Sequence, residues 1–145
     1  MNTWLKLILL TLTWGLVITG CSASPNQEGS TLGRITGCST GSGQGAQVGM
    51  QSPEFQFKDS DGQSISLSDL RGKGVLINFW AIRCPPCRGE MPYIQEIYDE
   101  WSDKGLVVLV INIGESSSQV EKFMESQHLS LPVLLDTKQA AAREY

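Results

Sequence analysis

Two cysteines stand three residues apart in the segment FWAIRCPPCRGEMP, which runs from Phe79 to Pro92. Cys84 and Cys87 could form a redox-active dithiol, contribute half of a zinc site, or make a structural disulfide. A redox couple needs one exposed, stabilised thiolate and a second sulfur within bridging reach. The pair follows an apolar run and precedes a helical pattern, and this context favours the redox interpretation.

A helix that begins at the cysteines would supply both conditions. Its unpaired N–H groups and the positive end of its dipole stabilise an anion at Cys84, and thiols so placed have pKa values of roughly 3.5 to 7.5. A spacing of three brings Cys87 onto the same side, shielded by the helix. Pro85 and Pro86 suit a helix start, because neither needs to donate an N–H there. We therefore expect Cys84 to attack a substrate disulfide and Cys87 to resolve the mixed disulfide.

The other two interpretations have less support. A zinc site needs four ligands, and the chain offers only Cys38 and the single His128 beyond the pair. A structural disulfide that closes so short a loop stabilises little, because the entropy removed grows with loop length. We expect no metal and no cofactor.

The elements around the cysteines predict an α/β fold. Val75–Trp80 is an apolar run interrupted by Asn78, as expected for a central strand buried on both faces, and Trp80 should pack beside the dithiol. Apolar residues then recur at helical spacing after the cysteines, at Met91, Ile94, Ile97, Tyr98 and Trp101. Pro92 falls inside this pattern and predicts a kink in the first turns.

Further elements precede and follow this unit. They are a β-hairpin with Phe55, Phe57, Ile65 and Leu67 at alternate positions, strands at Leu106–Ile113 and Leu131–Leu135, a helix opened by a capping box at Ser118–Glu121, and a last helix capped by Asp136 or Thr137 that runs to Tyr145. Strands that alternate with helices indicate a sheet with parallel crossover units.

The N-terminal part of the chain predicts export. Residues 1–20 carry one charge and a short apolar run, as in a signal peptide, and the sequence that ends at Cys21 resembles the lipoprotein box, in which the cysteine is lipidated. Residues 21–48 are rich in Gly and Ser and predict a flexible linker, followed by a domain at residues 49–145. The ITGCS motif recurs at Cys38, but no apolar run precedes it, so we expect a free thiol in the linker. A disulfide between Cys38 and Cys84 is the alternative.

Charge excludes one class of partner. The net charge is −4 and the sequence shows no basic stripe, so nucleic-acid binding has no electrostatic footprint. The expected partners are a lipid membrane, through the N-terminal anchor, and protein thiols or disulfides outside the cytoplasm.

The segment VGMQSPEFQFKDSDGQSISLSDLRGKGVLINFWAIRCPPCRGEMP resembles the extracytoplasmic thioredoxin-like proteins of the TlpA and redoxin group. The resemblance covers residues 48–145. It implies a thioredoxin-like fold and thiol–disulfide oxidoreductase activity, with Cys84 as the nucleophile and Cys87 as the resolving partner. It further implies disulfide or dithiol substrates among exported proteins, including apocytochrome c, and a membrane electron donor.

The sequence departs from the family pattern at several positions. Asn78 replaces the buried Asp of cytoplasmic thioredoxins, although Asn is usual in the TlpA-like group. Arg83 replaces a common Trp, and its charge should favour the Cys84 thiolate. Pro85 stands where some cytochrome-maturation members have an acidic residue. The chain stops at Tyr145, so we expect the fold to lack the C-terminal cis-proline strand, its hairpin partner and the last helix.

Two functional alternatives remain beside the oxidoreductase. A peroxiredoxin-like peroxidase shares the GxxSPEFxxxDxxG pattern, but it would want Thr or Ser three residues before its attacking cysteine, where this chain has Ala81. An inactive remnant or binding module is the non-enzymatic alternative. Reductase and oxidase directions are both compatible with a C-x-x-C helix start.

Overall fold

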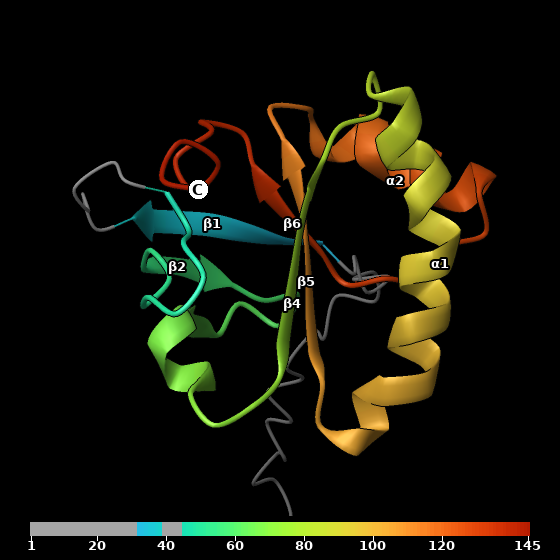
Figure 1. Ribbon diagram of the computed structural model, residues 1–145. Helices are drawn as coiled ribbons and strands as arrows, with labels where there is room; N and C mark the ends of the chain where they lie inside the picture. The colour runs from blue at the N-terminus through green and yellow to red at the C-terminus, as the bar shows by residue number, and fades with distance from the viewer. Residues whose placement is uncertain (1–31, 39–44) are drawn as a thin grey trace, which may run out of the picture.

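The computed structural model describes residues 32–38 and 45–145 (Figure 1). These residues form one six-stranded sheet in the order β3-β2-β1-β6-β5-β4. The strands are β1 (Leu32–Cys38), β2 (Phe55–Lys58), β3 (Ser64–Ser66), β4 (Val75–Trp80), β5 (Val107–Ile113) and β6 (Val133–Asp136), and the α-helices are α1 (Pro85–Trp101) and α2 (Ser117–Ser126). The predicted signal peptide and Cys21 lie outside the described residues. No helix in the described part is long and apolar enough to cross a membrane.

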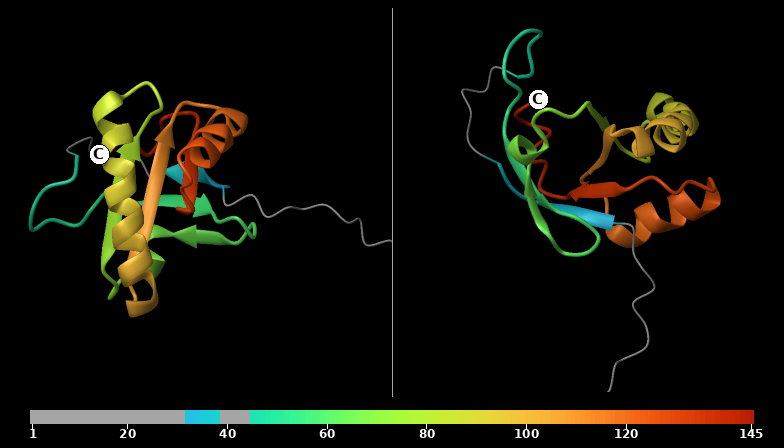
Figure 2. Two further views of the ribbon diagram at one scale, coloured as in Figure 1. Left: turned by 90° about the vertical axis from the view of Figure 1, so that its right-hand side faces the viewer. Right: turned by 90° about the horizontal axis from the view of Figure 1, so that it is seen from below.

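Both helices cover one face of the sheet (Figure 2). Strands β4, β5 and β6 pair in parallel, so α1 and α2 are crossover connections, and the predicted α/β alternation is confirmed. Successive β5 residues face opposite sides of the sheet. Val108 and Val110 pack under the helices, whereas Leu109 and Ile111 pack with Phe55 and Phe57 on the other side.

The predicted β-hairpin is confirmed as β2 and β3, which pair antiparallel with Phe57 opposite Ile65. Its turn is held by the carboxylate of Asp59, which accepts hydrogen bonds from the backbone N–H groups of Asp61 (3.0 Å) and Gln63 (2.8 Å). An aspartate that bonds its own turn in this way is a common device of short loops.

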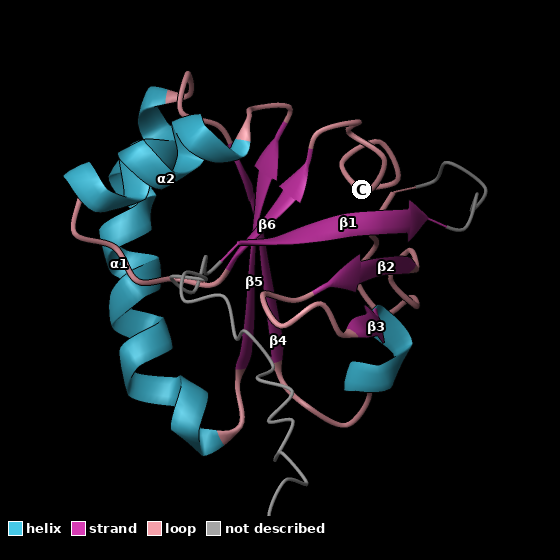
Figure 3. Cartoon of the chain, turned by 180° about the vertical axis from the view of Figure 1, so that it is seen from behind, coloured by secondary structure: helices cyan, strands magenta, loops and turns pink. Residues whose placement is uncertain are grey.

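The prediction that residues 21–48 are a linker is wrong for Leu32–Cys38. This segment is β1, which lies between β2 and β6 (Figure 3) and pairs parallel with β6 and antiparallel with β2. Its burial does not need large side chains. Gly33 is buried, and a Cβ there would collide with the carbonyl oxygen of Lys58 and come within 2.6 Å of Leu134 Cδ2. Composition alone suggested a tether because glycine contributes no apolar side chain, yet close strand packing requires it here.

The prediction that Val75–Trp80 is a central strand is also wrong. Among the described strands β4 lies at the edge and pairs with β5. Its side chains nevertheless face both layers: Leu76 and Trp80 pack under the helices, and Ile77 and Phe79 pack on the other side. An apolar run indicates that both faces of a strand are covered by other side chains. It does not indicate whether the strand has one or two neighbours in the sheet.

The helix boundaries follow local capping. Helix α1 begins after Cys84 and continues through Pro92, and Met91 and Ile94 are buried as predicted. Helix α2 begins after Ser116, whose backbone N–H donates to the side chain of Gln119 (3.1 Å), so the capping box is two residues earlier than predicted. Three consecutive serines each offered a possible cap.

The predicted last helix is not present in the structure, which has turns after β6. The buried carboxylate of Asp136 accepts hydrogen bonds from the backbone N–H groups of Ala140 (2.8 Å) and Ala142 (3.0 Å). The chain then folds back, so that Tyr145 packs against Phe79 and donates its hydroxyl to the carbonyl of Pro53 (2.9 Å). Aspartate competes for backbone N–H groups in this way, which makes its capping signal compatible with turns as well as helices.

Candidate redox site

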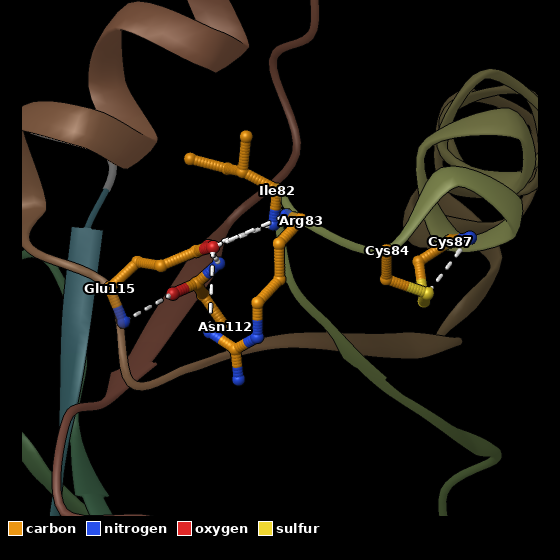
Figure 4. The surroundings of a disulfide bond; sticks show 6 residues. All are labelled: Ile82, Arg83, Cys84, Cys87, Asn112 and Glu115. Atoms are coloured by element: carbon orange, nitrogen blue, oxygen red, sulfur yellow. Dashed lines mark hydrogen bonds and ion pairs between the residues drawn. A yellow bond between two sulfur atoms is a disulfide. The ribbon is translucent and has the colours of Figure 1, made fainter.

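The dithiol sits at the start of α1. Cys84 and Cys87 are joined in a disulfide with a Cα–Cα distance of 5.3 Å (Figure 4). Cys84 is the N-cap residue, and its sulfur accepts a hydrogen bond from the backbone N–H of Cys87 at 3.4 Å. This is an orphan donor of the first helical turn, aimed at the sulfur where a thiolate would form. The sequence placed the pair at this position correctly, and its redox activity stays a prediction.

The two prolines occupy the first two helical positions. Pro85 and Pro86 are both exposed, and neither has an N–H that the helix would leave unpaired. The two cysteines are half-buried and differ in their surroundings. Cys87 packs against the core cluster under the helices, to which Trp80 belongs. This packing agrees with the expected role of Cys87 as the shielded sulfur.

Trp80 and Asn78 point to the helix-covered face from β4. Trp80 is buried, its ring lies 5.2 Å from that of Phe123 in α2, and it belongs to the core cluster against which Cys87 packs. Asn78 is half-buried, and its Oδ1 atom is enclosed without a hydrogen-bond partner among the described residues. The structure thus places Trp80 as a packing residue behind the site. Among the described residues, Asn78 makes no hydrogen bond to either cysteine.

Arg83 extends away from the sulfur atoms (Figure 4). Its Nη1 atom lies 3.8 Å from Oε1 of Glu115, and its side chain is 65% exposed. The expected influence of Arg83 on the Cys84 thiolate is therefore opposed by a carboxylate that the sequence analysis did not consider.

Glu115 is the residue that sequence reasoning missed. Its carboxylate accepts hydrogen bonds from the backbone N–H of Ile82 (2.8 and 3.0 Å), the backbone N–H of Arg83 (3.4 Å) and Nδ2 of Asn112 (2.7 Å). It lies in the loop after β5, far from the cysteines in the chain but beside the loop that precedes them. One signal was available: in parallel α/β sheets, functional groups gather where neighbouring strands end.

Comparison with known proteins identifies the family. The model of the AhpC/TSA family matches residues 48–145. The chain belongs to the AhpC/TSA family. Curated relatives include the thiol-disulfide oxidoreductase ResA of Bacillus subtilis, 40% identical over 97 residues that make up 67% of this chain and 54% of the relative. ResA of Geobacillus kaustophilus is 41% identical over 98 residues, 68% of this chain and 56% of the relative. The chain therefore spans about half the length of the curated relatives it matches.

Solved structures similar to this AhpC/TSA family member confirm the thioredoxin-like fold. The thioredoxin domain of a thiol-disulfide oxidoreductase from Bacteroides vulgatus has a TM-score of 0.56 and 28% identity, over 68% of this chain and 71% of that one. A putative protein disulfide isomerase from Bacteroides thetaiotaomicron has a TM-score of 0.63 and 31% identity, over 69% and 64%.

The remaining candidate ligands of this AhpC/TSA family member do not gather at the dithiol. Cys38 is a free thiol in β1, so the alternative of a Cys38–Cys84 disulfide is wrong for this structure. His128 is exposed beyond α2. Within residues 32–38 and 45–145 no group of three or more His, Cys, Asp or Glu side chains could hold a metal ion.

Proposed function

We propose that this chain is a membrane-anchored thiol–disulfide oxidoreductase that acts on exported proteins through Cys84 and Cys87. The observation that carries the proposal is the position of Cys84 as the N-cap of a 17-residue helix, with the N–H of Cys87 directed at its sulfur. The names of the ResA relatives support the same class of reaction.

The exchange follows from the different surroundings of the two sulfur atoms. In the reducing direction, the Cys84 thiolate attacks one sulfur of a substrate disulfide, and the other substrate sulfur leaves as a thiolate that takes a proton from solvent. The Cys87 thiol loses its proton and attacks the Cys84 sulfur, which releases the second substrate thiol. The protein is left with the Cys84–Cys87 disulfide. A dithiol donor at the membrane then reduces this disulfide to the two thiols and is itself oxidised to a disulfide.

Insulin reduction tests this reaction. The purified full chain, kept in mild detergent with dithiothreitol as the reductant, should precipitate insulin chains faster than dithiothreitol alone. Consumption of hydrogen peroxide without insulin reduction would instead support the peroxiredoxin-like alternative. Neither activity, together with a circular dichroism spectrum that lacks fixed tertiary structure, would support an inactive remnant.

The location is a separate part of the proposal. The apolar N-terminal run and Cys21 support a lipid anchor outside the cytoplasm, and exported thiol proteins such as apocytochrome c are the candidate substrates. Metabolic labelling with a radioactive fatty acid should mark the full chain and leave Cys21→Ala unlabelled. A fully labelled Cys21→Ala variant would contradict the anchor.

A further inference from the structure

We propose that Glu115 is a positioning residue of the dithiol site: its carboxylate fixes the loop that leads into Cys84 and holds the Arg83 charge away from the sulfur. The inference rests on the proposed thiol–disulfide exchange. The Glu115 carboxylate bonds Ile82, Arg83 and Asn112 and neither cysteine, so its effect passes through the residues between Trp80 and Cys84.

Several hydrogen-bond donors converge on the carboxylate of Glu115. The Glu115 side chain is only 10% exposed, and it accepts the N–H of Ile82 with both oxygen atoms and the N–H of Arg83 with one. Hydrogen bonds to an ionised acceptor are roughly twice as strong as neutral ones. Both backbone donors belong to the loop immediately before the N-cap cysteine, so the carboxylate specifies where that loop lies.

Glu115 is itself held in place by a residue of strand β5. Asn112 is fully buried in β5, where it lies opposite Trp80 in the pairing with β4. Its Nδ2 atom donates to the Glu115 carboxylate at 2.7 Å, and its Oδ1 atom accepts the Glu115 N–H at 3.3 Å. These two bonds lock the side chain to its own backbone turn. Figure 4 shows the resulting bridge from the end of β5 to the loop after β4.

The loop transmits this restraint to the cysteine. Cys84 donates its N–H to the carbonyl of Ala81 at 3.0 Å, which closes a tight turn that contains Ile82 and Arg83. Ala81 is buried beside Trp80, so the loop is fixed at its start by packing and at its middle by Glu115. Without Glu115, the backbone N–H groups of Ile82 and Arg83 would lose their acceptor, and the loop before Cys84 would be fixed only by the packing of Ala81 and by the hydrogen bond from Cys84 to its carbonyl.

The carboxylate also offsets a cation. The guanidinium of Arg83 is drawn to Glu115 at 3.8 Å, and the remaining negative field of the carboxylate disfavours a thiolate nearby. Removing the carboxylate charge frees the guanidinium, and both changes favour the thiolate. Since a stabilised thiolate favours the reduced state, the protein should become more oxidising.

The test measures the exchange equilibrium with glutathione and the thiolate titration of the full chain. For Glu115→Gln we expect the equilibrium to shift toward the dithiol by about three- to tenfold, with a lower Cys84 pKa. The insulin reduction rate should fall roughly threefold, because an amide offers one acceptor where the loop uses two. Glu115→Asp keeps the charge, so its glutathione equilibrium should match that of the wild type. Its shorter side chain should give an insulin reduction rate between those of Glu115→Gln and the wild type.

Two further variants keep the test decisive. Glu125→Gln removes one negative charge from an exposed position of α2 and should leave the equilibrium unchanged. Arg83→Met removes the exposed cation and should shift the equilibrium in the opposite direction, toward the disulfide, even if Glu115→Gln fails to fold. A wild-type equilibrium in Glu115→Gln, an equal shift in Glu125→Gln, or a dithiol shift in Arg83→Met would overturn the proposal.

Failure of the proposed function gives a different result. The glutathione equilibrium involves no protein substrate. If the wild-type chain does not reduce insulin but the variants shift the equilibrium as described, the proposed function is overturned and the role of Glu115 in setting the dithiol chemistry is supported.

Discussion

The cysteines of this protein occupy two contrasting environments. Cys84 caps a helix, and its sulfur receives a backbone N–H. Cys38 lies in β1, and its sulfur instead donates to the carbonyl of Glu54 at 3.3 Å. Burial and the negative charges of Glu144, Asp136 and Glu54 raise the pKa of the Cys38 thiol. The backbone therefore presents a donor to one sulfur and an acceptor to the other, and we expect this difference to make Cys84 the more reactive thiol.

Substitution of the two cysteines gives the largest contrast. Cys84→Ser removes the attacking sulfur, so insulin reduction should fall by at least about a hundredfold. Cys38→Ser should retain the wild-type rate within about twofold, because the Cys38 thiol takes no part in the exchange. The two rates are compared in the same insulin assay. A comparable loss in Cys38→Ser would remove the contrast between the sites.

Alkylation of the reduced full chain sharpens the contrast. At pH 7 we expect Cys84 to react with iodoacetamide at least about tenfold faster than Cys38, because the thiolate is the nucleophile. The gap should narrow as the pH rises above 9, where the raised pKa of Cys38 finally permits ionisation. Peptide mass spectrometry at a series of pH values gives both rates. Equal rates at pH 7 would mean that the helix end does not activate Cys84.

Gly33→Val tests whether the Cys38 site belongs to the sheet at all. A branched side chain would collide with Lys58 and Leu134, so the free energy of unfolding should fall by about 1–3 kcal/mol. Gly89→Ala is the control, because no atom beyond its chain neighbours and its own helix backbone lies within 4 Å of a Cβ placed there. Gly72→Val is unsuitable as a control, because the positive φ of Gly72 would strain any side chain. Urea unfolding measures both. An unchanged urea midpoint for Gly33→Val would contradict the packing of residues 32–38 in the sheet and would favour a flexible linker.

Tyr145→Phe has the smallest expected effect. It removes the hydroxyl that bonds the Pro53 carbonyl but keeps the ring against Phe79, so the free energy of unfolding should fall by about 1 kcal/mol.

Burial raises the pKa of the Tyr145 phenol, as it does for the Cys38 thiol. An acid whose pKa is raised by folding stabilises the folded state at pH values below its ordinary pKa, which is 10.0 for Tyr145 and 9.0 for Cys38. That stability is lost as the pH rises through the higher folded values. Tyr145→Phe should therefore lose less stability than the wild type on going from pH 8 to pH 11, and an equal loss would contradict this.

The sequence predicted the parts of the molecule that depend on local patterns. The helix start at Cys84 follows from two prolines and an apolar periodicity that includes Met91 and Ile94. The hairpin follows from alternation around an Asp-Gly turn. These features involve residues near one another in the chain, where spacing determines geometry.

The features that the sequence did not predict depend on distant partners. Leu32–Cys38 became a strand because β2 and β6 offered it two ladders and because Gly33 fits between them. Glu115 reaches a loop more than thirty residues earlier in the chain. Asp136 satisfied backbone donors of turns rather than a helix. In each case the structure is decided by a tertiary contact, which the spacing of residues along the chain does not predict.

Capture of the mixed disulfide tests the central claim most directly. In Cys87→Ser the resolving sulfur is absent, so attack on a substrate disulfide should stop at a covalent adduct. The full-length variant is incubated with a disulfide-bonded protein substrate, quenched in acid and analysed by non-reducing peptide mapping. The account predicts an adduct on Cys84 that dithiothreitol releases. An adduct found only on Cys38, or none with a folded protein, would contradict it.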